Sequence, residues 1–301
     1  MRIANYVRDG QATVGLVDGE MIFNIPRGAA RANNSELAKV NSLDEILAKD
    51  ILGTLRTSQE KITGAAEGEP TSNARLLSPV LSPEKILLVA VNYVSHGNEQ
   101  DVKLPPEPYF FTKFRNALVG PGDPIIVPRV SKKVDWEVEL AAIIGKKAKY
   151  VARNDAQGYV AGYTISNDIS FRDLQFPPGW PEKMNPLGQN WVKGKGLDNA
   201  FPLGPWLVTP DEIGDPYKLE ISLSVNGNIK QKSTTAEMVF KLDSLIEYIS
   251  AGMTLMPGDI ISTGTPLGVA VFSGQPFLKD GDIVEAGISK IGSLRNPVKS
   301  E

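Results

Sequence analysis

Residues 135–145 read DWEVELAAIIG, which places two glutamates inside an otherwise apolar stretch that has the pattern of a β-strand. Side chains of a strand alternate between its two faces, so Glu137 and Glu139 point the same way and Trp136 and Val138 point the other way. At about 3.3 Å of rise per residue the two carboxylates start roughly 7 Å apart, close enough to converge on one small cation. Two buried like charges are costly without a counter-ion. Either one carboxylate is protonated, or the face is solvated, or a cation lies between them.

The composition narrows the choice of cation. The chain has no cysteine and a single histidine, which excludes thiolate sites and zinc sites built from several histidines. Any metal is then bound mainly by oxygen, which favours Mg²⁺, Mn²⁺ or Ca²⁺. The net charge of −3 indicates no nucleic-acid partner, and the apolar runs are too short to span a membrane. Nothing at the N-terminus resembles a signal peptide, so we expect a cytoplasmic protein.

The 301 residues are enough for one large domain and a smaller one. We expect a small α+β domain over residues 1–73 and a catalytic domain over residues 74–301. In the small domain the patterns predict short strands at residues 3–6 and 13–17. They also predict a helix over residues 42–55 with Ser42 as its cap, and a linker over residues 64–73.

Beyond residue 74 short strands dominate and helices are few. An alternating apolar run ends at Asn226-Gly227, a strong signal for a β-hairpin. Residues 242–253 carry a helical apolar stripe. The fold class predicted is therefore mixed β (α+β) rather than an alternating βαβ fold.

Asp168 is the third acidic candidate, at a point where a strand is expected to end and a helix to begin. With Glu137 and Glu139 it would supply three oxygen ligands, although a turn or cap residue explains it equally well when taken alone. Arg172 and Gln175 are three residues apart and share a face of the expected helix. Arg172 is either a plain surface residue or a group that binds a substrate carboxylate.

His96 and Glu99 are spaced i and i+3, within contact range on a helical turn. That spacing suits a base held by an orienting carboxylate, though it also arises by chance. Lys195 lies in a Lys-Gly-Lys turn that lacks the spacing of a phosphate-binding P-loop. The loop around Thr265 is bracketed by glycines, so it either presents backbone N–H groups and a hydroxyl to an anion or is a simple turn.

Taken together and in this order, these segments resemble the fumarylacetoacetate hydrolase family over roughly residues 86–297. The ordered set is specific although each piece alone is weak. The pieces are Asn92-Tyr93-x-x-His96-x-x-Glu99, Phe110-Phe111-Thr112-Lys113, Asp135-x-Glu137-x-Glu139-Leu140, Asn167-Asp168-Ile169-Ser170-x-Arg172-Asp173-Leu174-Gln175, Gly194-Lys195, Pro202-Leu203-Gly204-Pro205, and Gly258-Asp259-Ile260-Ile261-x-Thr263-Gly264-Thr265-Pro266-x-Gly268-Val269.

The resemblance implies a β-sandwich roll, a homodimer, and Mg²⁺ or Mn²⁺ held by Glu137, Glu139 and Asp168. It assigns catalytic roles to the His96–Glu99 dyad and to Lys195. It also implies a set of residues that contact or polarise the substrate, which are Lys113, Arg172, Gln175 and Thr265. Two departures are Ser95, where an acidic residue is common, and a longer proline-rich segment over residues 176–189.

The activity that this resemblance implies first is hydrolytic cleavage of a C–C bond in an acylpyruvate-like β-diketo acid. The metal would act as a Lewis acid, and His96 would activate water. Decarboxylation of oxaloacetate, or isomerisation or dehydration of a related keto acid, is the alternative within the same family. A binding protein without turnover is the alternative outside enzymes, and the occupied motif positions argue against it.

Overall fold

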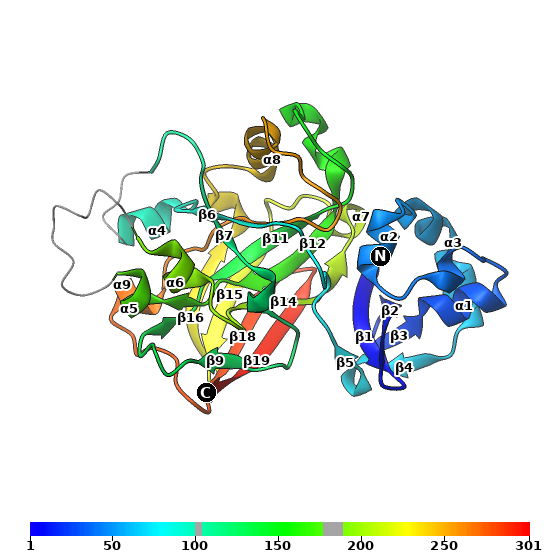
Figure 1. Ribbon diagram of the computed structural model, residues 1–301, viewed down its shortest axis with the longest axis horizontal. Helices are drawn as coiled ribbons and strands as arrows, with labels where there is room; N and C mark the ends of the chain where they lie inside the picture. Colours follow the sequence, from blue (N-terminus) through cyan, green and yellow to red (C-terminus); the bar gives the residue numbers. More distant parts are fainter. Residues whose placement is uncertain (100–103, 177–188) are drawn as a thin grey trace.

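Strand β1 (Arg2–Arg8) connects the two lobes of the computed structural model, which describes residues 1–99, 104–176 and 189–301. Within these ranges the side chain of Glu99 is not described. In the smaller lobe β1 pairs along its length with β2 (Gln11–Asp18). Its first residues also pair with the body, as Arg2 and Ile3 lie opposite Val208 and Leu207 of β14 (Phe201–Val208). The N-terminal lobe therefore continues the main sheet of the body (Figure 1).

The N-terminal lobe contains the two strands expected from the sequence and a helix capped as expected. The Ser42 hydroxyl accepts a hydrogen bond from the Glu45 backbone N–H at the start of α2. The single helix expected over residues 42–55 is divided, because Asp50 takes a positive φ of 53° between the two helices. The remaining elements of the lobe are β3 (Met21–Asn24), α1 (Ile25–Arg31), α2 (Leu43–Ala48), α3 (Leu52–Ala65), β4 (Gly68–Pro70) and β5 (Arg75–Leu76).

The linker expected over residues 64–73 is wrong. Residues 68–70 form β4, which pairs with β3 so that Gly68 lies opposite Phe23. A Cβ at Gly68 would lie 2.7 Å from the Phe23 ring, so the glycine makes room for this aromatic side chain. A glycine that signals a loop by composition here permits close packing within a sheet.

The body is built from two large sheets and a small two-stranded one, and the predicted fold class is confirmed. The main sheet has twelve strands among the described residues, with the central order β1-β14-β12-β11-β17-β6-β7, and the second has the order β16-β15-β18-β19-β9. The strands of the body are β6 (Ile86–Ala90), β7 (Tyr109–Lys113), β8 (Leu118–Val119), β9 (Ile125–Val127), β10 (Val134–Asp135), β11 (Val138–Ile144), β12 (Val160–Asn167), β13 (Ser170–Phe171), β15 (Glu220–Val225), β16 (Asn228–Thr234), β17 (Ile260–Ser262), β18 (Ile283–Ile288) and β19 (Gly292–Ser300). The expected hairpin at Asn226-Gly227 joins β15 and β16.

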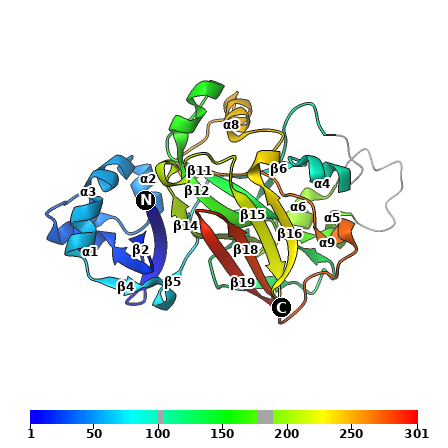
Figure 2. The same ribbon diagram turned by 180° about the vertical axis from the view of Figure 1, so that it is seen from behind.

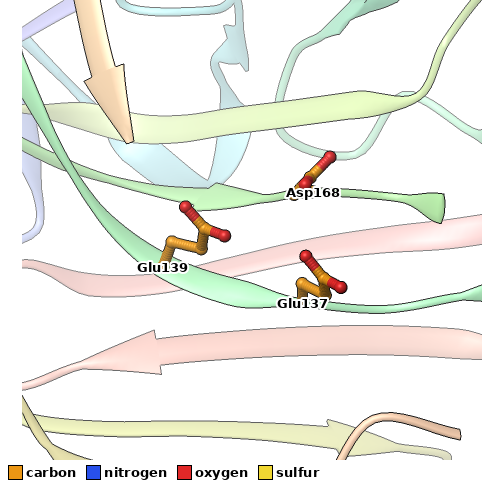
Figure 3. Close-up of side chains that lie close together, drawn as sticks. All are labelled: Glu137, Glu139 and Asp168. Carbon is orange, nitrogen blue, oxygen red and sulfur yellow. The ribbon is translucent and has the colours of Figure 1, made fainter. Parts of the chain in front are cut away.

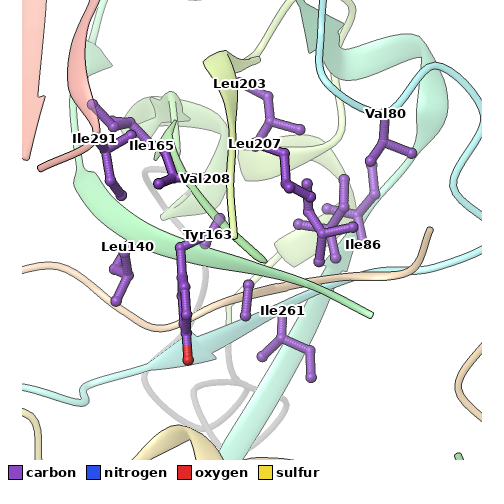
Figure 4. Packing of buried hydrophobic residues seen from close by; sticks show 14 of the residues in the cluster. Val80, Ile86, Leu140, Tyr163, Ile165, Leu203, Leu207, Val208, Ile261 and Ile291 are labelled. Carbon is purple, nitrogen blue, oxygen red and sulfur yellow. The ribbon is translucent and has the colours of Figure 1, made fainter. Parts of the chain in front are cut away.

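Strands β11 and β12 form the centre of the core, and every residue in both is buried. Their apolar side chains belong to the main hydrophobic cluster, and Figure 4 shows this packing around Leu140, Tyr163 and Ile165. Removing this much apolar surface from water is the main driving force for folding. These two rigid strands carry the acidic residues to fixed positions.

Four short helices lie together at the end of the body opposite the N-terminal lobe (Figures 1 and 2). They are α4 (Val94–Glu99), α5 (Arg172–Gln175), α6 (Trp191–Lys195) and α9 (Ala270–Ser273). The other α-helices in the described part of the body are α7 (Pro210–Ile213) and α8 (Leu242–Ser250). Among the described residues, no helix combines the length and the apolar character needed to cross a bilayer.

Candidate active site

Three carboxylates meet at the ends of β11 and β12. Glu139 lies within β11, Glu137 immediately precedes it, and Asp168 immediately follows β12. Glu137 and Glu139 point to the same side of the chain and face Asp168 (Figure 3). Each residue offers an oxygen within 4.8 Å of the others, and all three are buried. The period-two spacing and the position at a strand end thus bring together the three metal ligands proposed from the sequence.

The strand expected over residues 135–145 is interrupted just before the site. Asp135 belongs to β10, which pairs with β13, and β11 begins only at Val138. Between them the Glu137 backbone N–H donates to the Asn167 side chain, and the Asp168 N–H donates to the Glu137 carbonyl. These bonds fix Glu137 and Asp168 to each other through the backbone.

Lys195 forms ion pairs with two of the three carboxylates. Its Nζ lies 2.9 Å from Glu137 Oε2 and 2.6 Å from Asp168 Oδ2, and it also donates to the Ser170 hydroxyl at 2.6 Å. The three ammonium hydrogens are therefore all engaged. The Lys195 ammonium also lies 5.1 Å from the centre of the Phe111 ring. Lys195 closes α6 and is almost fully buried, so its position is set by packing as well as by charge.

Arg172 holds the other oxygen of Glu137 and is itself held by Asp135. Its Nη2 lies 2.6 Å from Glu137 Oε1, and its Nε lies 2.8 Å from Asp135 Oδ2. Its Nη1 donates to Gln175 Oε1 at 3.0 Å, so the i and i+3 residues do share a face. Although burial works to raise the pKa of Glu137, Lys195 and Arg172 hold it below the usual range.

Lys113 lies behind the site rather than in it. Its Nζ donates to the backbone carbonyls of Ile169, Lys195 and Ala200 at 2.6–2.8 Å, and Asp168 Oδ1 lies 2.9 Å away. Burial lowers the pKa of Lys113 to about 8, although Asp168 acts in the opposite direction. With these contacts Lys113 ties three segments of the site together. It is absent from the described cavity wall, so the substrate contact expected from the resemblance stays a prediction.

Glu139 differs from Glu137 in having no cation within ion-pair distance among the described residues. Its Oε2 accepts hydrogen bonds from the Ser262 hydroxyl and from the Gly264 N–H at 2.9 Å. Burial, reinforced by the neighbouring charges of Asp168 and Glu137, raises the pKa of Glu139 well above its usual range. Burial also raises the pKa of Asp168 in spite of the two lysines. When Asp135 is included, four carboxylates here face two lysines and one arginine, so the ionised carboxylates outnumber these cations by one.

These features fit a divalent cation bound by oxygen. Asp168 Oδ1 is buried and has the Lys113 ammonium 2.9 Å away, and because a carboxylate oxygen has two lone pairs, one remains for a ligand. Glu139 is the carboxylate that most needs a counter-charge. Three carboxylates without nitrogen or sulfur ligands suit Mg²⁺ or Mn²⁺, which keep further positions for water or substrate.

A cavity of about 170 Å³ opens onto this site. Its polar wall includes the two glutamates and most of the other residues proposed from the sequence, namely His96, Glu137, Glu139, Arg172, Gln175, Lys195 and Thr265. Its apolar wall includes Phe111, which stacks on Trp191 at 4.5 Å between ring centres, and Phe272. His96 is buried in α4 and contacts the Phe272 ring edge-on. The side chain of Glu99 lies outside the described residues, so the dyad stays a prediction.

Sequence reasoning missed several residues that build the site. Asp135 anchors Arg172 and also accepts from the Ala270 N–H at the start of α9. It lies two residues before Glu137, so the same period-two pattern pointed to it. Ser170 belongs to the quoted motif around Asp168 but was given no role, whereas Ser262 carries no signal in the sequence that distinguishes it from other serines. Their roles come only from the register of the strands that bear them.

The fold and this buried acidic site can now be compared with known protein families. Residues 85–299 match the sequence model of the family described as fumarylacetoacetate (FAA) hydrolase C-terminal. The match covers more than half of the chain, so the chain belongs to the fumarylacetoacetate hydrolase family. Its three buried carboxylates form a site that could hold a metal ion.

The chain is also similar to individual proteins of known name. The chain is 49% identical over 228 residues to oxaloacetate tautomerase fahd2, mitochondrial, of Xenopus laevis, covering 75% of this chain and 69% of the relative. It is 42% identical over 279 residues to oxaloacetate tautomerase FAHD2A, mitochondrial, of Bos taurus, covering 90% and 86%. Maleylpyruvate hydrolase of Sphingobium sp. SYK-6, solved in complex with manganese(II) and pyruvate, has a TM-score of 0.77 and 31% identity, covering 100% of this chain and 99% of that chain.

Proposed function

We propose that this chain is a metal-dependent tautomerase that interconverts the keto and enol forms of oxaloacetate or a closely related 2-keto diacid. The observation that carries the proposal is that His96 and the glutamates of the carboxylate cluster open onto one cavity. The curated relatives named as oxaloacetate tautomerases support the choice of reaction. This reading takes the isomerase alternative of the sequence analysis ahead of hydrolysis.

Glu137, Glu139 and Asp168 would hold the cation, which we propose to be Mg²⁺ or Mn²⁺. When bound, it supplies Lewis-acid stabilisation to the negative charge of an enolate. The relative solved with manganese and pyruvate supports both the ion and the keto-acid class.

His96 is the base proposed to move the proton. Keto–enol interconversion removes a proton from the carbon next to the ketone and returns one to the ketone oxygen, so no water is consumed and no other bond breaks. Histidine suits this exchange because its ordinary pKa lies near neutrality. The imidazole lies in the cavity wall, while Lys113 lies behind it.

Arg172, Lys195 and Gln175 would orient the substrate and balance its charge. Arg172 has five N–H donors and uses three of them on Asp135, Glu137 and Gln175, which leaves two for a carboxylate. Lys195 lies in the wall of the same cavity, and its buried positive charge would stabilise the negative charge of an enolate there.

Hydrolysis of an acylpyruvate is the second candidate. The aromatic wall formed by Phe111, Trp191 and Phe272 offers an apolar surface to an acyl chain, which oxaloacetate lacks. The likeness to maleylpyruvate hydrolase supports the same reading. Homodimer formation and a cytoplasmic location stay predictions, and the two curated relatives above are named as mitochondrial.

The test follows the enol absorbance of oxaloacetate with protein, Mg²⁺ or Mn²⁺, and pyruvate detection in parallel. We expect the enol to convert to the keto form faster than in buffer without release of pyruvate, and Glu137→Gln to abolish the effect. Release of pyruvate from oxaloacetate would establish a decarboxylase instead. Turnover of a short acylpyruvate, with oxaloacetate unaffected, would establish the hydrolase.

A further inference from the structure

Strand β11 loses its neighbour where it approaches the glutamates. Its pairing with β17 ends at Ala141, opposite Ser262, and the Thr263 N–H makes a last bond to the Leu140 carbonyl. Val138, which lies between Glu137 and Glu139, has its N–H and C=O on this open side without a strand to pair with. Unpaired backbone groups of a buried strand are costly, so side chains must replace the missing strand.

The Gln231 side chain, from β16 in the second sheet, supplies the replacement. Its Oε1 accepts from the Val138 N–H at 3.0 Å, and its Nε2 donates to Thr265 Oγ1 at 2.9 Å and to the Pro266 carbonyl at 2.8 Å. The amide orientation is fixed, because Val138 N–H can only donate and the Pro266 carbonyl can only accept. Gln231 is 1% exposed, and every hydrogen of its amide is used.

The same bonds fix the Thr265 hydroxyl. Oγ1 receives a hydrogen from Gln231 Nε2, and it donates its own hydrogen to the Val138 carbonyl at 2.9 Å. A hydroxyl has one hydrogen and two lone pairs, so one lone pair remains for the cavity that Thr265 lines. Toward a ligand Thr265 is thus an acceptor, which suits a hydroxyl such as that of an enol rather than a carboxylate oxygen.

We infer that Gln231 is a positioning residue of this site. Its hydrogen bonds connect Val138, between the two glutamates, to the loop that carries Thr265. In this way Gln231 sets the distance between the two carboxylates and makes the Thr265 hydroxyl an acceptor toward the cavity. The loop is pressed against β16 at Gly268, where a Cβ would lie 2.2 Å from the Lys230 carbonyl oxygen. The inference deepens the proposed function and rests on its metal-binding part.

The test measures Mn²⁺ affinity by calorimetry on the full chain, with oxaloacetate kinetics beside it. Gln231→Met keeps the size of the side chain but removes its hydrogen bonds, and we expect a Kd at least about tenfold weaker, as for groups that support metal ligands. Thr265→Val breaks the connection at its other end and serves if Gln231→Met does not fold. Because both act on one connection, the double variant should lose much less than the product of the single losses.

Asn296→Leu is the matched control, because Asn296 is also a buried amide and donates to the Gly120 and Asp123 carbonyls outside the cavity wall. We expect it to lower stability and to keep the wild-type Kd. Wild-type affinity in both Gln231→Met and Thr265→Val, or an equal loss of affinity in Asn296→Leu, would overturn the inference alone. A wild-type protein that binds no Mn²⁺ would overturn the proposed function and the inference with it.

Discussion

The Lys195 ammonium lies 2.6 Å from Asp168 Oδ2, so a lysine shares the very carboxylate that we propose as a metal ligand. Its other hydrogens bind Glu137 and Ser170. A buried carboxylate needs a counter-charge, and Lys195 supplies it to Asp168 and Glu137 before any metal binds. Metal and lysine therefore compete for the same negative charge.

Replacing Lys195 by methionine tests this competition. Breaking a buried ion pair by removing one partner costs about 3–5 kcal/mol, so Lys195→Met should be markedly less stable than wild type in the presence of a chelator. Mn²⁺ should restore much of that stability and should bind at least as tightly as to wild type, while turnover is lost. Thermal unfolding with chelator and with Mn²⁺ measures both effects. A large loss of Mn²⁺ affinity would show that Lys195 assists the metal instead.

Glu139 should make the metal-free protein less stable as the pH rises. Its pKa in the folded protein is raised above the ordinary value of 4.5, so the folded chain binds more protons than the unfolded chain over the range between the two values. Stability is then full below about pH 4.5 and falls as the pH rises toward the folded pKa. Mn²⁺ should remove this dependence by compensating the charge.

Glu139→Gln separates stability from metal binding. The amide oxygen still accepts from Ser262 and Gly264 but carries no charge. In chelator at pH 8 we expect the variant to be more stable than wild type, because the neutral amide avoids the cost of a buried charge. Its calorimetric Mn²⁺ binding should be lost. Equal stability of the two proteins across pH 5 to 8 would contradict a raised pKa at this position.

His96→Ala should affect chemistry without affecting the metal. Removal of a general base typically lowers a rate by about 10²–10⁴-fold, and we expect kcat for enol–keto conversion to fall by that amount. Mn²⁺ affinity should stay at the wild-type value, because the proposed ligands are the three carboxylates. The comparison needs steady-state kinetics and calorimetry on the same preparation. An unchanged kcat would remove His96 from the mechanism.

Asp135→Asn should act through Arg172. The charge of Asp135 holds Arg172 Nε at 2.8 Å and orients the guanidinium toward the cavity. With a neutral partner the guanidinium is less well fixed, and we expect KM for oxaloacetate to rise about tenfold, which corresponds to about 1.4 kcal/mol. The effect on kcat should be smaller. Asn296→Leu again serves as a control for lost stability, and a fall in kcat at constant KM would argue against a substrate-orienting role.

The sequence pattern predicted the parts of the site that depend on local periodicity. Glu137 and Glu139 lie on one side because side chains of an extended segment alternate, and Arg172 and Gln175 meet because helical neighbours at i and i+3 do. The fold class followed from many short strands and one clear hairpin. These inferences need only the residues within a few positions of each other.

Other features depend on register between distant segments, which no local pattern contains. The motif around Lys113 predicts a substrate contact, but no local pattern shows that its ammonium donates to three carbonyls of other segments. Gln231 lies 93 residues from Val138 in the sequence, and only the packing of the second sheet on the first brings them together. Residues 64–73, rich in Gly, Ala, Glu, Pro, Ser and Thr, predicted a linker because composition cannot show which aromatic ring a glycine accommodates.

The long sequence separations within the site have a kinetic consequence. Lys195 and Glu137 are 58 residues apart, and Ser262 and Glu139 are 123 apart, so their contacts close large loops. Contacts of this kind form late, since the entropy of loop closure is lost before they are made. The unfolded chain holds no preformed site, and Mn²⁺ added during refolding should therefore bind only as the central strands complete their pairing. The binding of the metal would then report the last stage of folding rather than initiate folding.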